Sequence, residues 1–333
     1  MLVLAANPEL DQHDTGSEHP EQPARLRAAL SGIDAAGLRD AVVRTEPRRA
    51  SEEELALVHP RAYLESLRVF CEAGGGAVDP DTVAVPGSWD TALLAVGGGL
   101  AAIERLDEGA GDVAFVAARP PGHHASANRA MGFCLLNNVA VSAALLAERG
   151  ERVLIVDWDV HHGNGTEDIF WDDPRVLYVS THQSRLYPGT GAADETGGPN
   201  AEGLTVNVPL PSGATGDVVR RAIEEVAGPV VQRFGPTWVL VSAGFDAHRA
   251  DPLASLRLTA SDFADLASTV TAFSPRLGRM VLFLEGGYDL DALRMSVGAT
   301  LATLLGRSYR PEPPSSGGPG DEMVEMARRI HDI

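Results

Sequence analysis

Short runs of apolar, mostly β-branched residues recur along the chain and predict buried strands. Amphipathic stretches between several of these runs predict helices. The strand candidates are VAFVAA (113–118), VLIVDWD (153–159), VLYVSTH (176–182), LTVNVPL (204–210), WVLVSAGF (238–245) and MVLFLEGGY (280–288). The helix candidates are NVAVSAALLAERG, DVVRRAIEEVAGPVVQRF and SDFADLASTVTAF. Strands that alternate with helices predict an α/β fold with a mainly parallel central sheet and helices on both faces.

The first hundred residues have a more helical pattern. SEEELALVHPRAYLESLRVF (51–70) opens on a capping box formed by Ser51 and Glu54. No linker separates this part from the strands, and the one break in composition is PEPPSSGGPG (311–320), which a short helix candidate follows. We therefore predict a single domain over residues 1–310 and a tail over 311–333, which is either docked or mobile.

Composition and charge exclude several classes of protein. The net charge is −19, from 46 acidic and 27 basic residues, and this field repels nucleic acid and attracts cations. The two cysteines are far apart, so no disulfide framework or thiolate metal site is expected. The N-terminal segment lacks a basic region, and no apolar run is long enough to span a membrane. We expect a cytoplasmic protein, and its Ala, Gly and Arg usage is typical of a GC-rich bacterium.

Polar residues cluster where the predicted strands end, and ligands of open α/β sheets bind beyond the carboxyl ends of the strands. In VLIVDWDVHHGNGT, Asp157, Asp159 and His161 alternate along an extended segment, so they face one side of it. Asp246, at the end of another strand, offers a further carboxylate, although such a residue alone is more often a helix cap. Asp, His and Asp ligands with an open position for water are typical of a catalytic zinc site.

Two further clusters add groups that can move protons or polarise a carbonyl. RPPGHHA places His123 and His124 after a rigid turn, and imidazoles with a near-neutral pKa suit general acid and base roles. LEGGYDL places Tyr288 on a diglycine turn, where its phenol can reach a carbonyl oxygen.

Taken together, RPPGHHA, MGFCLLNNVA, DWDVHHGNGT, SAGFDAH and LEGGYDL resemble the histone deacetylase superfamily in order and spacing, with wording closest to its class II and bacterial amidohydrolase branch. The resemblance covers most of the chain and implies a single arginase-like domain. It also implies that metal-activated water hydrolyses an amide. The implied zinc ligands are Asp159, His161 and Asp246, and the implied catalytic residues are His123, His124, Tyr288, Asp157, which orients His123, and Asn164, which stands beside His124. Some relatives carry Asp in place of Asn164, and this difference bears on the basicity of His124.

The resemblance also implies a narrow acyl-lysine tunnel and a structural potassium site. Phe133, with its neighbour Gly132, and Tyr187 match the tunnel walls, although relatives more often carry Phe at the second position. The residues matching the potassium site are Asp157, Asp159, His161, Ser180 and Thr181.

Substrate and partners are less firmly indicated. Acylated lysine in proteins, acetylated polyamines and other acylated small amines all fit such a tunnel, and Leu253 at the rim favours acyl-lysine over the polyamine reading. Asp81 is a candidate rim contact to substrate, or else a turn residue after Pro80. A competing function is that of a dimanganese ureohydrolase, which shares the predicted architecture, but this function would give no role to His123, His124 and Tyr288. A catalytically inactive sensor of acyl-lysine or a metabolite is expected to have lost at least one site residue. The sequence does not define the oligomeric state, and a homo-oligomer is one of the alternatives.

Overall fold

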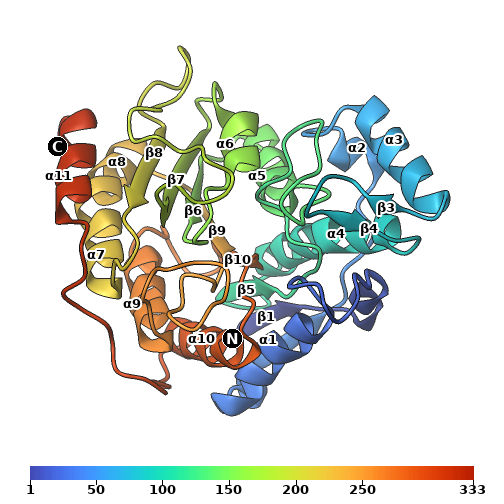
Figure 1. Cartoon of the computed structure of the whole chain (residues 1–333), viewed down its shortest axis with the longest axis horizontal. Coiled ribbons are helices and arrows are strands. Elements are labelled where there is room, and N and C mark those ends of the chain that lie inside the picture. Colours follow the sequence, from blue (N-terminus) through green and yellow to red (C-terminus); the bar gives the residue numbers. More distant parts are fainter.

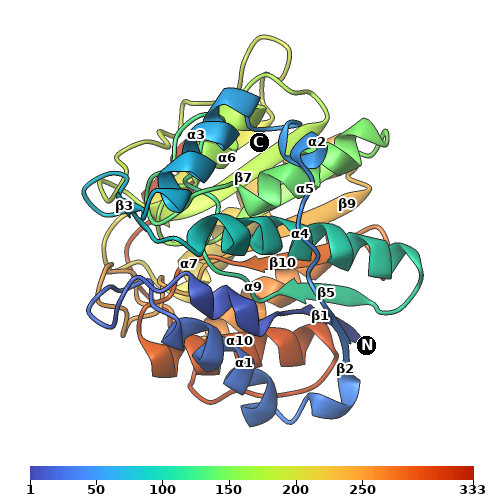
Figure 2. The ribbon, with the colours of Figure 1, turned by 90° about the vertical axis from the view of Figure 1, so that its right-hand side faces the viewer.

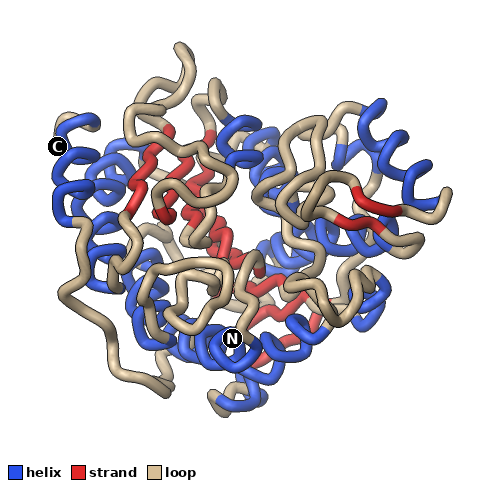
Figure 3. Tube along the Cα trace, in the orientation of Figure 1, coloured by secondary structure: helices blue, strands red, loops and turns tan.

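The computed structural model describes residues 1–333. Its strands are β1 (Leu2–Ala5), β2 (Val42–Thr45), β3 (Gly76–Ala77), β4 (Val83–Ala84), β5 (Val113–Val116), β6 (Val153–Asp157), β7 (Val176–Gln183), β8 (Thr205–Leu210), β9 (Trp238–Ala243) and β10 (Met280–Leu284). Eight of them form one parallel sheet in the order β2-β1-β5-β10-β9-β6-β7-β8, which runs diagonally through the molecule in Figures 1 and 3. The strands β3 and β4 form a separate antiparallel pair.

Helices cover both faces of the sheet. They are η1 (Pro8–Gln12), α1 (Ala24–Ala35), η2 (Arg39–Ala41), α2 (Glu52–Leu55), α3 (Arg61–Glu72), α4 (Ser88–Asp107), α5 (Asn138–Glu148), α6 (Asn164–Phe170), α7 (Gly216–Arg221), the π-helical turn η3 (Ala222–Ala227), α8 (Gly228–Phe234), α9 (Ala260–Thr271), α10 (Leu290–Leu304) and α11 (Asp321–Ile330). The pair α4 and α5 packs on one face, whereas α1, α10 and α9 form a row on the other, as Figure 2 shows. This arrangement confirms the predicted α/β fold. No helix is both long and apolar enough to span a lipid bilayer.

All six predicted strands are present. Four of them (β5, β6, β9 and β10) end two to four residues before the predicted runs do, whereas β7 extends one residue further. The N-terminal region differs from the expectation, because β1 and β2 add two parallel strands to the sheet. The predicted helix over 51–70 is two helices, α2 and α3, since Pro60 lies between them and cannot donate a backbone hydrogen bond. The capping box at Ser51 and Glu54 is formed as predicted.

The sheet brings the polar clusters together. β5, β10, β9 and β6 are consecutive in the sheet, although they are spread over residues 113 to 284 of the chain. Their carboxyl ends meet at one edge, where side chains after each strand converge. Within this edge Asp157, the last residue of β6, pairs with Ser180 on one neighbouring strand and Ser242 on the other.

Candidate active site

A buried group of two carboxylates and one imidazole lies at the carboxyl ends of β6 and β9. Asp159 and His161 follow β6, and Asp246 follows β9. His161 Nδ1 lies 3.2 Å from Asp159 Oδ1 and 3.0 Å from Asp246 Oδ2. Two ligands that are each about 2.0–2.1 Å from a tetrahedral zinc ion lie about 3.3 Å apart, so these spacings suit such an ion. The sequence motifs placed the three residues in one site, and the structure brings them together.

The surroundings of these carboxylates also fit a cation. Burial, with the negative charge of Asp159 in addition, raises the pKa of Asp246 to about 7. Two carboxylates buried together are costly unless a positive charge compensates them. A Cβ atom on Gly286 would lie 2.1 Å from Asp246 Oδ2, so only glycine permits the close approach of this turn. The backbone N–H of Gly286 donates to Asp159 Oδ2 at 2.8 Å.

His123 and His124 lie next to this group, on the loop after β5, and have different partners. His123 Nδ1 lies 3.0 Å from Asp157 Oδ2, and His124 Nδ1 lies 2.8 Å from Asn164 Oδ1. Burial alone would lower the pKa of His123, but the charges of Asp157 and Asp159 raise it to about 10. Burial and the neighbouring His123 and His161 hold the pKa of His124 well below its ordinary value. The pair therefore offers one protonated and one neutral imidazole side by side.

Tyr288 follows β10 on the diglycine turn, where Gly287 has a φ of +120°. Its backbone N–H donates to Asp251 Oδ2 at 2.7 Å, and the guanidinium carbon of Arg25 lies 4.8 Å from the centroid of its ring. Arg25 Nε also donates to the carbonyl oxygen of Gly287 at 2.7 Å. Burial raises the pKa of Tyr288 well above its ordinary value, so the phenol keeps its proton at neutral pH and can donate it.

Aromatic side chains surround the approach to the histidines. The ring centroid of Phe133 lies 5.7 Å from that of Tyr288, and the ring of Tyr187 lies edge-on to His124 at 5.2 Å. Phe133 itself has a φ of +67°. Gly132 has a φ of +56°, and a Cβ atom there would lie 2.4 Å from Cδ2 of His124. The MGFC motif thus brings the chain against His124 only because Gly132 has no side chain.

The two predicted rim residues lie in loops, Asp81 between β3 and β4 and Leu253 between β9 and α9. The carbonyl oxygen of Asp81 lies 3.2 Å from Nε2 of His19, whose ring packs edge-on against Phe133. Burial raises the pKa of Asp81, and the neighbouring Asp79 adds to this shift. Leu253 is half-buried, and its backbone N–H donates to Asp251 at 2.9 Å.

Ser180 and Thr181, the remaining predicted ligands, lie in β7 beside Asp157. The hydroxyl of Ser180 lies 2.9 Å from His182 Nδ1. The hydroxyl of Thr181 is buried and has no hydrogen-bond partner.

Three residues that hold the site were missed by the sequence analysis. The Glu285 carboxylate accepts hydrogen bonds from the backbone N–H groups of Gly122 at 2.7 Å and His123 at 3.2 Å. Arg25 and Asp251 hold the turn that carries Tyr288. A signal was present for Glu285, because a carboxylate at the end of an apolar strand needs a buried partner. Arg25 lies in a helix whose sequence gives no indication that this guanidinium is buried.

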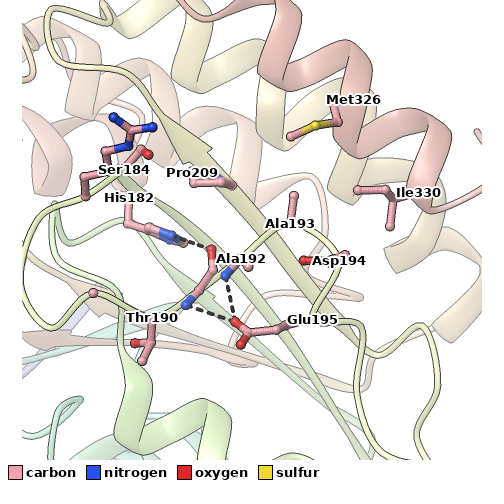
Figure 4. A pocket seen from close by; sticks show the side chains of 13 residues that line it. His182, Ser184, Thr190, Ala192, Ala193, Asp194, Glu195, Pro209, Met326 and Ile330 are labelled. Atoms are coloured by element: carbon pink, nitrogen blue, oxygen red, sulfur yellow. Dashed lines mark hydrogen bonds between the residues drawn. The ribbon is translucent and has the colours of Figure 1, made fainter.

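A cavity of about 600 Å³ lies away from the metal-ligand group, between the loop that follows β7 and helix α11. His182, Glu195, Met326 and Ile330 are among its lining residues, and Figure 4 shows α11 forming one side of it. Glu195 accepts hydrogen bonds from the backbone N–H groups of Gly191 and Ala192, at 3.0 and 2.7 Å.

A parallel α/β sheet whose central strands end at a buried Asp, His and Asp group, beside two histidines and a tyrosine, is the architecture of an arginase-like metal-dependent hydrolase. The model of the histone deacetylase domain family matches residues 19–304, which is most of the chain. The chain therefore belongs to the histone deacetylase family and is an amide-hydrolysing enzyme of the deacetylase and amidohydrolase type. The predicted family and its arginase-like fold are confirmed.

Individual relatives agree with this assignment. A probable deacetylase of Methanothermobacter thermautotrophicus is 39% identical over an alignment of 336 positions that covers 99% of this chain and 98% of the relative. A histone deacetylase-like amidohydrolase of Pseudomonas aeruginosa is 38% identical, over 84% of this chain and 74% of the relative. The crystal structure of the HDA15 HD domain superposes with a TM-score of 0.91 at 35% identity, covering 99% of this chain and 94% of that domain.

Proposed function

We propose that this chain is a zinc-dependent hydrolase that removes acetyl or other acyl groups from lysine side chains or small amines. The observation that carries the proposal is the buried group of Asp159, His161 and Asp246 beside His123 and His124. Nitrogen and carboxylate ligands in this number leave room for water and substrate on a catalytic zinc ion. A zinc ion there would polarise the substrate carbonyl and lower the pKa of water from 15.7 toward about 7.

The side chains around the ion account for the proton transfers. A neutral imidazole of the histidine pair accepts the proton of the attacking water, and a protonated imidazole of the pair donates a proton to the departing amine. Asp157 stabilises the protonated form of His123, and Asn164 orients His124 without adding charge. The phenol of Tyr288 donates a hydrogen bond to the oxygen of the former carbonyl as negative charge develops on it.

The aromatic approach supports a substrate with a slender chain. Phe133 and Tyr187 would contact the methylene groups on both sides of an acylated amine. Gly132, which has no side chain, lets the protein backbone pass close to His124. At the rim, Asp81 would accept hydrogen bonds from the substrate, and the apolar Leu253 favours acyl-lysine over a polyamine. An acetylpolyamine would place a second ammonium group near Asp81, and it remains the alternative substrate class.

We also propose a structural ion, a cellular location and an assembly state for this enzyme. A potassium ion beside Asp157, Ser180 and Thr181 would stabilise the ends of β6 and β7, and the unpartnered hydroxyl of Thr181 supports a polar ligand nearby. We propose a cytoplasmic, bacterial enzyme whose acidic surface gives nucleic acid no direct role. A homo-oligomer is compatible with this function.

The decisive experiment compares amine release from an acetyl-lysine peptide and from N-acetylputrescine by the zinc-loaded protein. Turnover of either substrate that is lost in Tyr288→Phe and Asp246→Ala would establish the hydrolase and choose its substrate class. Zinc bound in stoichiometric amount without turnover of either substrate would contradict deacetylation. Binding of these amides without turnover would instead support a catalytically inactive sensor of acyl-lysine or a metabolite.

A further inference from the structure

The segment between α10 and α11 runs back across the loop that carries the metal ligand Asp246. In Figure 1 it runs along the lower left edge of the molecule and rises to α11. Glu312 lies in this segment, and its carboxylate is only 12% exposed. Its Oε2 atom lies 2.8 Å from Nε2 of His248, and its Oε1 atom accepts from Nη2 of Arg249 at 2.7 Å. Both partners follow Asp246 within three residues.

The hydrogen bonds of His248 define which of its nitrogen atoms carries the proton. The backbone N–H of Ala250 donates to Nδ1 of His248 at 3.1 Å, so Nδ1 is an acceptor. Nε2 therefore carries the hydrogen and donates to the Glu312 carboxylate. The histidine side chain is 2% exposed, which shields this bond from competition with water. One carboxylate thus fixes both a side chain and the path of the loop.

The same loop reaches a second part of the active site. Three residues after His248, Asp251 accepts the backbone N–H of Tyr288 at 2.7 Å. The loop therefore carries a metal ligand at one end and the support of the phenol at the other. Glu312 holds the loop midway between these two positions, and its Oε2 atom also accepts the backbone N–H of Ala260, at the start of α9, at 3.0 Å.

We propose that Glu312 is a positioning residue of the active site, which acts through His248 and Arg249 on Asp246 and Asp251. The proposal rests on the proposed zinc-dependent hydrolysis. Glu312 lies beyond the part of the chain that the family model matches, which ends at residue 304. The tail is accordingly part of the catalytic unit. It also joins the core, because Val324 and Ala327 of α11 are buried in the same cluster as the central strands.

A matched control separates positioning from simple stabilisation. Ser315, three residues along the same segment, donates to Asp262 Oδ2 at 2.6 Å and accepts from the backbone N–H of Gly216 at 2.9 Å. These bonds anchor the tail at the starts of α7 and α9, but they do not reach the loop after Asp246. Ser315→Ala therefore weakens the anchoring of the tail while leaving Glu312 in place.

The experiment measures three quantities for Glu312→Ala, Glu312→Gln and Ser315→Ala. They are the zinc dissociation constant by chelator competition, kcat and KM for the better substrate, and Tm of the zinc-free protein. We expect Glu312→Ala to weaken zinc binding and to lower kcat about 10-fold, the lower end of the range for outer partners of metal ligands, with KM little changed. Glu312→Gln keeps an acceptor for His248 and should lie between Glu312→Ala and the unmodified protein. Ser315→Ala should lower Tm alone.

Equal zinc affinity and kcat in Glu312→Ala and Ser315→Ala would overturn the proposal and reduce Glu312 to a structural anchor. If Glu312→Ala does not fold, full zinc affinity and kcat in Glu312→Gln would overturn it as well, because the amide keeps only one acceptor oxygen and the joint hold on His248 and Arg249 would then be unnecessary. A protein without hydrolase activity, in which Glu312→Ala still weakens zinc binding, would contradict the proposed function and leave the positioning role intact.

Discussion

His124 Nδ1 lies 2.8 Å from the amide oxygen of Asn164, whereas its neighbour His123 faces the carboxylate of Asp157. A neutral acceptor stabilises the protonated form of an imidazole less than a carboxylate does. The two adjacent histidines also differ in pKa, because the charges of Asp157 and Asp159 outweigh burial at His123, whereas burial and the neighbouring His123 and His161 lower the pKa of His124.

Replacing that neutral acceptor by a carboxylate should move the pH dependence of the reaction. Asn164→Asp places a negative charge beside His124 and raises its pKa, and an opposite charge at this distance shifts a pKa by about 1 to 3 units. The acidic limb of the kcat/KM profile should move to higher pH, because neutral His124 then requires a higher pH. Profiles of the two proteins from pH 5 to 9 test this. A limb in the same position would mean that His124 is not the titrating base.

Removing the phenol of Tyr288 should affect the transition state rather than substrate binding. Tyr288→Phe keeps the ring beside Phe133 and Arg25 but loses the hydroxyl. We expect kcat to fall about 10²- to 10³-fold with a small change in KM, as for other single oxyanion donors. Steady-state kinetics at full zinc occupancy measure this effect. A rise in KM at constant kcat would assign Tyr288 to ground-state binding instead.

A methyl group at Gly286 should weaken the metal site although every ligand remains. The added Cβ atom would lie 2.1 Å from Asp246 Oδ2 and 2.6 Å from Asp159 Oδ2, so these carboxylates must move apart. We expect Gly286→Ala to retain less zinc after dialysis than the unmodified protein. Gly228→Ala is the control, since its Cβ atom would meet only a carbonyl oxygen at 3.7 Å. Equal zinc content in both variants would contradict this account of the site.

The hydroxyl of Tyr187 is buried without a hydrogen-bond partner, so its removal should not destabilise the fold. An unpaired buried polar group costs about 1 to 3 kcal/mol, and Tyr187→Phe should therefore keep or raise Tm. It should also favour longer acyl groups, because the tunnel wall becomes more apolar. Tyr178→Phe is the matched control, since that hydroxyl shares its one hydrogen between Asp157 Oδ2 and the carbonyl oxygen of Gly163, each at 3.2 Å, and its loss should lower Tm. A fall in Tm of Tyr187→Phe equal to that of Tyr178→Phe would contradict the prediction.

His59 should make the fold sensitive to mild acid. Its Nε2 atom accepts the backbone N–H of Asn137 at 3.0 Å, so protonation would break this bond. Burial lowers the pKa of His59 from 6.5 to about 4. The unfolded chain takes up a proton below pH 6.5 and the folded chain does not, so this stability is complete above pH 6.5 and is lost as the pH falls toward 4.

Denaturant unfolding between pH 4 and 7 measures that loss. The contribution of His59 reaches at most about 3 kcal/mol, at about 1.4 kcal/mol per pH unit. His59→Gln keeps an acceptor for Asn137 but does not titrate, and its stability should depend less steeply on pH. Identical slopes for the two proteins would show that other groups dominate the acid response.

The fold was largely predictable, because its central strands are continuous apolar runs that polar, glycine-rich segments follow. The edge formed by β2 and β1 was not predictable. β1 has only four residues and β2 is largely half-buried, so neither has a clear pattern of apolar residues. The motifs also grouped the metal-ligand and histidine clusters, whose members are close in sequence or lie at strand ends. Arg25, Asp251 and Glu312 escaped detection because each acts through backbone or loop contacts across a long sequence separation, which no local spacing records.

The order of strands in the sheet has a consequence for when the proposed metal site forms. Asp159 and His161 come from the end of β6 and Asp246 from the end of β9, while β10, which supplies the turn behind them, pairs with β5 far earlier in the chain. Parallel pairings between distant segments form late in folding, because closing long loops is costly in entropy. A metal ion would therefore meet the complete group of Asp159, His161 and Asp246 only after the middle of the sheet has assembled. Metal uptake should report the last stage of folding rather than initiate it.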